Sequence, residues 1–340
     1  MKTDDFFYNL PPEKIAQRPA KPRDSSRLLV LDRTDNTVTH HIFHNLPDLL
    51  NPGDVLVFND TRVLPARLKA HKIPTGGQVE ILLLKQITPD TWETLVGGKR
   101  VRPGLQLQIT SSLQAEVIEH LGRSKRILRF SNDIKPQLDE IGEMPLPPYI
   151  HEPLQSKDEY QTLFAKNDGS AAAPTAGLHF TQPLLKKIRD NDVKLAAVTL
   201  HVGLDTFAPV TETDPQDHTI HTEWCSISNE TVELLRTARA NGHRIVAVGT
   251  TTTRVLETAA QMTSPPEWIA PFSGPTDLFI LPGWDFRVVD SLITNFHLPR
   301  STLLMLVSAF AGRERILATY QMAMEHGYRF YSFGDAMLIR

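Results

Sequence analysis

The spacing of hydrophobic and polar residues changes at about residue 65 and again at about residue 150. Before the first change, the apolar runs at 28–31 and 54–58 predict short buried strands. From Pro65 to Phe130, apolar and polar residues alternate in short runs, which Gly-Gly, Pro-Gly and Ser-Ser pairs separate. This alternation predicts a small antiparallel β-barrel or sandwich inserted into a larger domain.

The alternating runs of this insert lie at 78–84, 92–96, 105–109, 115–118 and 126–130. The insert ends in MPLPPYI at 144–150, a proline-stiffened stretch that is typical of a linker. We therefore predict one domain from residues 1–64 and 150–340, and an inserted β-barrel domain with its linker at residues 65–149.

Beyond the insert, strand, loop and helix patterns repeat. Apolar runs at 194–200, 244–248 and 288–293 predict three strands, and each is followed by polar residues. Thr181 and Ser301 or Thr302 are candidate N-caps of helices at 182–191 and 303–311, and a third helix is expected at 255–262. These patterns predict an α/β fold with a barrel-like, mostly parallel sheet, whose active site lies where the strands end.

The loop AAAPTAGLHFT at 171–181 is a candidate binding site. Its alanines and Gly177 let a ligand approach the backbone, and the N-terminus of the helix that follows favours an anionic group. The alternative is that small residues stand here because another element packs tightly against them, with His179 as a buried structural histidine. The loop alone does not decide between the two.

Composition restricts the protein class. The 340 residues include 41% hydrophobic residues, enough for a substantial core. The N-terminus lacks the basic start and apolar run of a signal peptide, and the apolar run 303–312 is too short to span a bilayer. The single cysteine, Cys225, excludes an intramolecular disulfide and fits a reducing cytoplasm. We expect a soluble, cytoplasmic monomer.

The formal net charge of −3 means that nucleic-acid binding requires a local basic surface. Lys99, Arg100 and Arg102 lie at one predicted turn of the insert, and the basic residues at 123–126 lie at another. Either cluster is suited to phosphates, although such residues more often form a solvated loop. Arg62 follows a strand directly and is a further candidate.

Two motifs offer weaker alternatives. GTTTTR at 249–254 lacks the spaced glycines and the lysine of a triphosphate-binding loop, so we reject an NTPase. His218, His221 and Glu223 are residue types that ligate zinc, but the histidines are three apart in a segment without helical character. No metal site is predicted, and no GxGxxG turn indicates a dinucleotide.

Eight segments together resemble one enzyme family. They are FNDTRVLPARL at 58–68, MPLPPYI at 144–150, AAPTAGLHFT at 172–181, VTLHVG at 198–203, HTIHTEW at 218–224, AVGTT at 247–251, TNFHLPRSTLLMLVSAFAG at 294–312 and YRFYSFGDAML at 328–338. The combination runs nearly end to end and is similar to that of the S-adenosylmethionine:tRNA ribosyltransferase-isomerases of queuosine biosynthesis.

The resemblance implies a tRNA-modifying transferase and isomerase. Its substrates would be S-adenosylmethionine and tRNA that carries 7-aminomethyl-7-deazaguanine at the wobble position. The ribosyl part would move to the amine, giving epoxyqueuosine, adenine and methionine. S-adenosyl-L-methionine would be consumed, so no recycled cofactor is expected. Such chemistry requires a base, an acid or donor for adenine, and an anion site for the methionine carboxylate.

Roles follow as hypotheses. The base and acid are expected among His179, His201 and His297, and Glu223 is expected to pair with a histidine or the substrate amine. Residues expected to hold S-adenosylmethionine are Thr175, Gly177, Gly203, Thr250, Thr251, Asn295 and, at its carboxylate, Arg254. Arg62 is expected to contact tRNA phosphate.

The chain departs from the family pattern at Asp205, Thr252, Thr253 and Arg300, so no catalytic role is carried over to Asp205. Three other classes stay open: a noncatalytic RNA-binding module, a metal-dependent hydrolase and a methyltransferase.

Overall fold

The computed structural model describes residues 1–203 and 209–340, and Asp205 lies outside them. The chain divides into two compact units. The large unit comprises Met1–Thr61, Pro148–Asn167 and Ala173–Arg340, and the barrel unit comprises Arg62–Pro147 and Asp168–Ala172. The barrel unit thus includes a short segment from beyond the linker, which the alternation pattern did not indicate.

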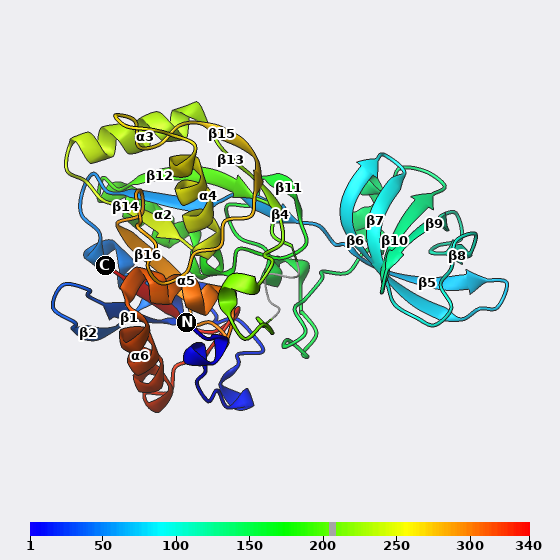
Figure 1. Ribbon diagram of the computed structural model, residues 1–340, viewed down its shortest axis with the longest axis horizontal. Helices are drawn as coiled ribbons and strands as arrows, with labels where there is room; N and C mark the ends of the chain where they lie inside the picture. The colour runs from blue at the N-terminus through cyan, green and yellow to red at the C-terminus, as the bar shows by residue number, and fades with distance from the viewer. Residues whose placement is uncertain (204–208) are drawn as a thin grey trace. The chain divides into compact units, whose positions relative to one another are not determined.

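A nine-stranded sheet forms the centre of the large unit (Figure 1). Its order is β15 (Phe272–Thr276), β13 (Glu223–Ile227), β12 (Lys194–Leu200), β3 (Val55–Asn59), β14 (Ile245–Val248), β16 (Ser291–Asn295), β17 (Ala336–Ile339), β1 (Arg27–Leu31) and β2 (Val38–Ile42). The central strands β12, β3, β14 and β16 are mutually parallel, and antiparallel pairs lie on both sides of them.

The α/β class is confirmed, but the large sheet is not barrel-like. Within the described residues it is open, with β15 and β2 at its two ends, because antiparallel strands extend the parallel centre on both sides. Polar groups at the carboxyl ends of the parallel centre therefore share one edge.

The large unit also contains longer helices. They are α2 (Gln182–Asp190), α3 (Asn229–Ala240), α4 (Thr250–Gln261), α5 (Thr302–Ala311) and α6 (Arg313–Glu325). Leu184, Leu185 and Ile188 of α2 pack in one core cluster with Leu56 of β3 and Val246 of β14. Helices α3 and α4 both contact β12 and β14.

The predicted helix caps are confirmed at two positions. The Thr181 hydroxyl accepts a hydrogen bond from Leu184 N, and the Ser301 hydroxyl accepts one from Leu304 N. Helix α4 begins at Thr250, five residues earlier than expected. Its N-cap is Gly249, whose φ of 89° is a conformation that glycine adopts without a steric penalty.

The third predicted strand is shifted by two to three residues. It spans Ser291–Asn295, because Val288 and Val289 donate their backbone N–H groups to the buried carboxylate of Glu257 on α4. These two valines therefore satisfy their amides with a side chain rather than with a neighbouring strand.

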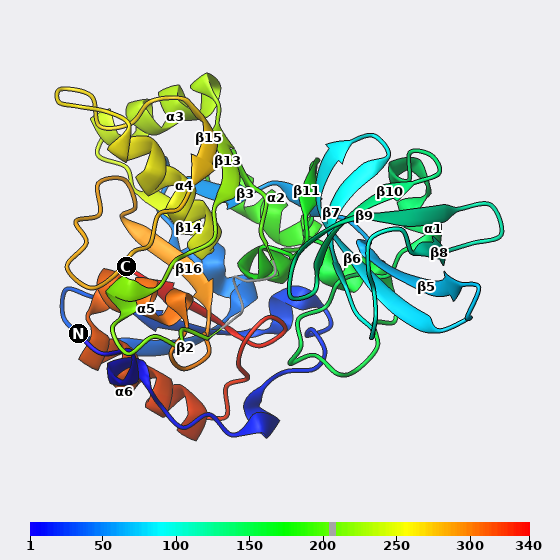
Figure 2. The same ribbon diagram turned by 45° about the vertical axis from the view of Figure 1, so that its right-hand side comes forward.

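The barrel unit contains a closed six-stranded barrel, shown from a second angle in Figure 2. Its order is β10 (Lys125–Phe130), β7 (Thr91–Val96), β6 (Gln78–Thr88), β5 (Arg67–Ile73), β8 (Gln106–Gln108) and β9 (Gln114–Gly122). All its pairs are antiparallel, so the predicted inserted β-barrel is confirmed. Strand β5 had not been predicted. The unit also contains the short helix α1 (Leu138–Ile141).

The remaining elements are short. A two-stranded sheet pairs β4 (Thr61–Val63) with β11 (Asn167–Ser170). The 3-10 helices are η1 (Thr3–Phe6), η2 (Pro12–Lys14), η3 (Arg23–Ser25), η4 (Phe43–Leu49), η5 (Lys135–Gln137), η6 (Lys157–Tyr160), η7 (Thr175–His179) and η9 (Pro215–Asp217). Within residues 1–203 and 209–340, none of the helices has the length and apolar character needed to cross a membrane.

Candidate functional site

The polar residues that follow the parallel strands meet at one edge of the large sheet, as predicted. Asn59 ends β3 and links two of these strand ends. Its amide nitrogen donates to Leu200 O at 3.0 Å and to Thr251 Oγ1 at 3.3 Å, and its oxygen accepts from Leu200 N at 3.0 Å. The same oxygen accepts from Thr61 N at 3.1 Å, a contact that is typical of an asparagine in a turn.

An open cavity of about 450 Å³ lies at this edge, and we call it the strand-end cavity. It brings together five predicted residues: Thr175, Thr250, Thr251, Asn295 and His297. The first turn of α4 lines it, so free backbone N–H groups are available to a ligand there.

A second cavity of about 510 Å³ adjoins the first, since Leu303 lines both. We call it the arginine cavity. The Arg254 guanidinium pairs through Nη1 with Glu223 Oε2 and donates from Nε to Leu278 O at 3.0 Å. Glu223 Oε1 accepts from Gly203 N at 2.7 Å. Three predicted residues, Gly203, Glu223 and Arg254, thus act as one unit.

Arg254 retains one unused donor. Its Nη2 is buried and has no hydrogen-bond partner among the residues that the structure describes. Arg254 and Glu223 are 5% and 7% exposed, so water compensates little for this missing bond. An anionic acceptor that enters the arginine cavity would satisfy it.

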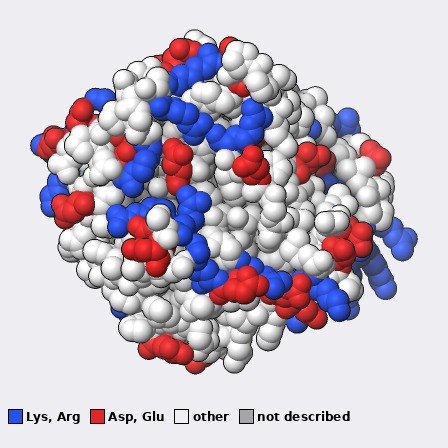
Figure 3. All heavy atoms as spheres, turned by 60° about the vertical axis from the view of Figure 1, so that its left-hand side comes forward, with Lys and Arg blue, Asp and Glu red and all other residues white. Residues whose placement is uncertain are grey.

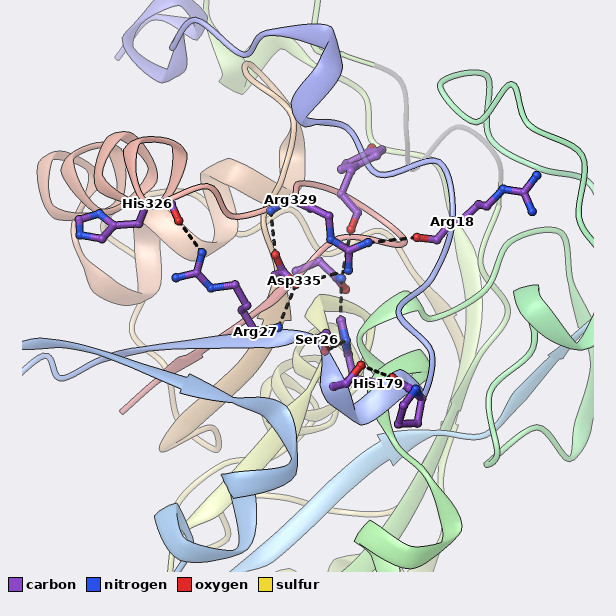
Figure 4. A network of polar contacts seen from close by, with 11 residues as sticks. Arg18, Ser26, Arg27, His179, His326, Arg329 and Asp335 are labelled. Carbon is purple, nitrogen blue, oxygen red and sulfur yellow. Dashed lines mark hydrogen bonds and ion pairs between the residues drawn. The ribbon is translucent and has the colours of Figure 1, made fainter.

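His179 lies in a buried chain of hydrogen bonds (Figure 4). Its Nδ1 is 2.8 Å from Ser26 Oγ, and its Nε2 is 3.0 Å from Asn295 Nδ2. Asn295 Nδ2 also donates to Tyr331 O at 3.2 Å, and Asn295 Oδ1 accepts from Thr175 Oγ1 at 3.2 Å. This chain reaches the strand-end cavity through Asn295 and Thr175.

The chain fixes the protonation of His179. A carbonyl oxygen only accepts, so the contact with Tyr331 O identifies Nδ2 as the amide nitrogen of Asn295. His179 Nε2 must then accept from it, and the ring proton is on Nδ1, which donates to Ser26. Burial, with the charges of Arg23 and Arg329, lowers the pKa of His179 to about 3. The ring is neutral near pH 7.

A second part of the same network holds the segment that carries Tyr331. The buried Asp335 carboxylate accepts from the backbone N–H groups of Arg27 at 2.9 Å and Arg329 at 2.8 Å. Tyr331 has φ of 74°, a left-handed conformation that is rare for a bulky residue. Because Tyr331 lines the strand-end cavity, this strained residue fixes part of the cavity wall.

His297 lines the strand-end cavity directly. Its Nε2 is 2.9 Å from Thr294 Oγ1, and its backbone N donates to Tyr320 Oη at 3.0 Å. Burial lowers its pKa to about 3, so this ring is also neutral near pH 7. Within the described residues, no group hydrogen-bonds to its Nδ1.

His201 follows β12 but lies differently. Its Nδ1 is 2.9 Å from Thr61 Oγ1, and its ring stacks on Trp224 with centroids 5.3 Å apart. Among the described residues that line the two cavities, neither His201 nor Gly177 is found. A Cβ at Gly177 would lie 3.0 Å from Thr162 Cγ2, so close packing favours glycine there. The assignment of both residues to substrate stays a prediction.

The helix N-terminus after the 171–181 loop has a partner within the protein. Thr181 Oγ1 donates to Asp24 Oδ2 at 2.6 Å, so a carboxylate already lies at the first turn of α2. The strand-end cavity lies instead at the first turn of α4.

The other predicted residues are spread over both units. His218 Nδ1 is 2.8 Å from Glu212 Oε2, and His218, His221 and Glu223 all line the arginine cavity. Within the described residues, no three metal-ligating side chains cluster closely enough to hold an ion.

The basic residues predicted to contact nucleic acid belong to the barrel unit. Arg62 lies 3.6 Å from Asp139 and 3.7 Å from Asp168. Lys99, Arg100 and Arg102 are exposed at a turn, as expected.

The whole chain is similar to proteins of one family. Residues 3–339 match the family described as queuosine biosynthesis protein. The S-adenosylmethionine:tRNA ribosyltransferase-isomerase of Moorella thermoacetica is 52% identical, and that of Dehalococcoides mccartyi is also 52% identical, each over 100% of both chains. The crystal structure of the Thermotoga maritima S-adenosylmethionine tRNA ribosyltransferase is 40% identical, with a TM-score of 0.58 over 99% of this chain and 100% of that one.

Proposed function

Because the chain belongs to the queuosine biosynthesis protein family, we propose that it transfers and isomerises the ribosyl part of S-adenosylmethionine onto 7-aminomethyl-7-deazaguanine at the tRNA wobble position. It is an enzyme of the S-adenosylmethionine:tRNA ribosyltransferase-isomerase class. The observation that carries the proposal is 52% identity over the entire length of relatives with that name.

The reaction has a defined balance. The sulfonium acidifies the neighbouring C5′ proton, a base removes it, and the ribose ring opens as adenine departs. Adenine and the ring oxygen leave C1′, and C1′ forms bonds to the tRNA amine and to C5′, which closes a ring of carbon atoms. The oxygen that stays on C4′ displaces methionine from C5′ and closes the epoxide. Of the two protons lost, from C5′ and from the amine, one goes to adenine and one to solvent. One S-adenosylmethionine is consumed per epoxyqueuosine formed, with one adenine and one methionine released and no recycled cofactor.

We place S-adenosylmethionine across the two adjoining cavities. Its ribose and adenine lie in the strand-end cavity, against Thr175, Asn295 and the N–H groups at the start of α4. Its carboxylate extends into the arginine cavity and accepts from Arg254 Nη2. This placement gives the orphan donor an acceptor, and Glu223 holds the guanidinium in position.

The three histidines have different proposed roles. His297 has an unoccupied Nδ1 within the described residues and lines the cavity, so we assign it direct contact with the substrate. His179 uses both ring nitrogens within the protein, so it acts on the substrate by orienting Asn295. We propose that His201, which is half-buried beside Thr61, transfers a proton in the reaction.

The partners follow from the same proposal. They are S-adenosylmethionine and tRNA that already carries the aminomethyl-deazaguanine. We also propose that the enzyme works as a monomer in the cytoplasm.

The test is an incubation with S-adenosylmethionine and tRNA that carries 7-aminomethyl-7-deazaguanine, with adenine and methionine followed by chromatography. Stoichiometric release of both products is expected. The matched control is the same tRNA with guanine at that position, which lacks the amine. Formation of S-adenosylhomocysteine would indicate a methyltransferase, and bound but unchanged tRNA would indicate a noncatalytic RNA-binding module.

A further inference from the structure

Three turns lie at one end of the barrel. The β5–β6 turn follows Ile73, the loop after β7 begins at Gly97, and the β9–β10 hairpin turns at Gly122. Gly97 N donates to Glu80 O near the start of β6, and Val96 N donates to Ser124 O in the hairpin at 2.8 Å. Side chains from separate parts of the sequence therefore come together at this end.

This end of the barrel carries unneutralised positive charge. Lys99, Arg100, Arg102 and Arg123 are exposed, and none of them forms an ion pair with a residue of the described chain. We call these four residues the basic rim. By contrast, Arg67, Lys69, Lys125 and Arg129 of the same unit each pair with a glutamate at 2.5–3.1 Å.

The charge of the chain is also unevenly divided. The barrel unit contains 13 Lys and Arg against 10 Asp and Glu, whereas the whole chain contains 36 against 39. On the face in Figure 3, basic and acidic side chains lie interspersed. A polyanion is therefore attracted to the barrel unit in preference to the acidic remainder.

Two rim residues adopt backbone conformations that disfavour arginine. Arg100 has φ of 59° and Arg123 has φ of 42°, in the left-handed region that glycine or asparagine tolerates best. Arginine at these positions gives a lower free energy of unfolding than glycine or asparagine would. Strained conformations of this kind are typical of functional sites, and the guanidinium is the group that arginine adds.

A buried arginine joins the two basic turns. Arg126 is 7% exposed and donates from Nε to Val101 O at 3.2 Å and from Nη1 to Arg123 O at 2.8 Å. Lys72 Nζ also donates to Lys99 O. The backbones of the two turns are thereby tied to each other, which places their exposed charges at one end of the barrel.

We propose that the basic rim, Lys99, Arg100, Arg102 and Arg123, is a single binding surface for the phosphate backbone of the RNA substrate. Arginine forks and a lysine at one end of the barrel suit phosphate oxygens, and contacts of this kind carry no sequence information. That the RNA is tRNA rests on the proposed function. The surface itself rests on the charge, strain and contacts of the barrel.

The test replaces Arg100 and Arg123 by asparagine, singly and together, and measures tRNA affinity at several salt concentrations. Each replacement is expected to weaken binding roughly fivefold to tenfold near 0.1 M salt and to reduce the log–log salt slope by about one. The melting temperature should hold or rise, because asparagine tolerates the left-handed conformation. Lys85→Asn, also exposed on the barrel, is the control and should keep the parent affinity.

Two results would overturn the inference: a double variant with the affinity and salt slope of the parent, or a binding loss matched by a lower melting temperature. Adenine release by the parent enzyme is measured in parallel. A parent that binds tRNA through the rim but releases no adenine would refute the proposed reaction and leave the surface intact. A parent that releases adenine while the double variant binds normally would refute the surface alone.

Discussion

Lowering the pH should destabilise the large unit through two buried histidines. His179 and His297 have pKa values lowered to about 3 from an ordinary value of 6.5. The unfolded state therefore binds more protons between these values, and the free energy of unfolding falls as the pH falls through 6.5. From pH 7.5 to pH 5, each histidine should remove about 2 kcal/mol, or about 4 kcal/mol together.

The assay is urea unfolding at half-unit steps from pH 7.5 to pH 4.5, followed by tryptophan fluorescence. Three of the four tryptophans, at 224, 268 and 284, belong to the large unit. Near pH 5 the two histidines together should give a slope of about 2.7 kcal/mol per pH unit, and His179→Gln should halve that contribution. His71→Gln, in the barrel unit, should leave this transition unchanged.

A flat profile in the parent between pH 6 and pH 4.5 would refute the assignment of two neutral, buried histidines. A slope that survives His179→Gln unchanged would refute the role of that residue in particular. Either result would also remove the basis for assigning His179 an orienting role.

Three further predictions concern single contacts. Arg254→Gln should destabilise the protein by about 3–5 kcal/mol, because Glu223 is left as an unpaired buried charge, and it should raise the KM for S-adenosylmethionine. A double variant, Arg254→Met with Glu223→Met, should regain stability but keep the high KM. If both the stability and the KM recover, Arg254 does not bind the substrate carboxylate. Gly334→Ala should lower the melting temperature in a thermal scan, because the Cβ of the new alanine would lie 2.4 Å from Arg329 O. An unchanged melting temperature would contradict this backbone geometry. Glu257→Gln should lower the free energy of unfolding in urea by about 1–3 kcal/mol, because the Glu257 carboxylate accepts from three successive backbone N–H groups. An unchanged free energy of unfolding would mean that these amides have other acceptors.

Local patterns predicted the elements whose stability is local. The caps at Thr181 and Ser301 depend on residues three positions away, and the alternation in the insert reports which face of each strand is buried. The early start of α4 was hidden, because threonines have low helix propensity. In the fold, Thr252 and Thr253 bond to the carbonyls four residues before them.

The chemistry of the site depends on distant residues and could not be predicted in the same way. The tautomer of His179 is set by Ser26 and Asn295, which are 153 and 116 positions away. The Asp335 carboxylate accepts from the backbone N–H of Arg27, the residue after Ser26. The strained Tyr331 lies in the motif at 328–338, but no role had been predicted for it or for the other residues of that motif. The local sequence there offers only a glycine followed by an acid, Gly334 and Asp335.

The central claim is the fate of the three parts of S-adenosylmethionine, and isotopic labelling tests it most directly. S-adenosylmethionine labelled in the ribose, the methyl group or the adenine is incubated in turn with the tRNA that carries 7-aminomethyl-7-deazaguanine, and the digested nucleosides are analysed by mass spectrometry. The ribose label should enter the modified nucleoside, whereas the methyl and adenine labels should appear in free methionine and free adenine. A methyl label in the tRNA, or a ribose label that stays with adenine, would contradict the proposed transfer.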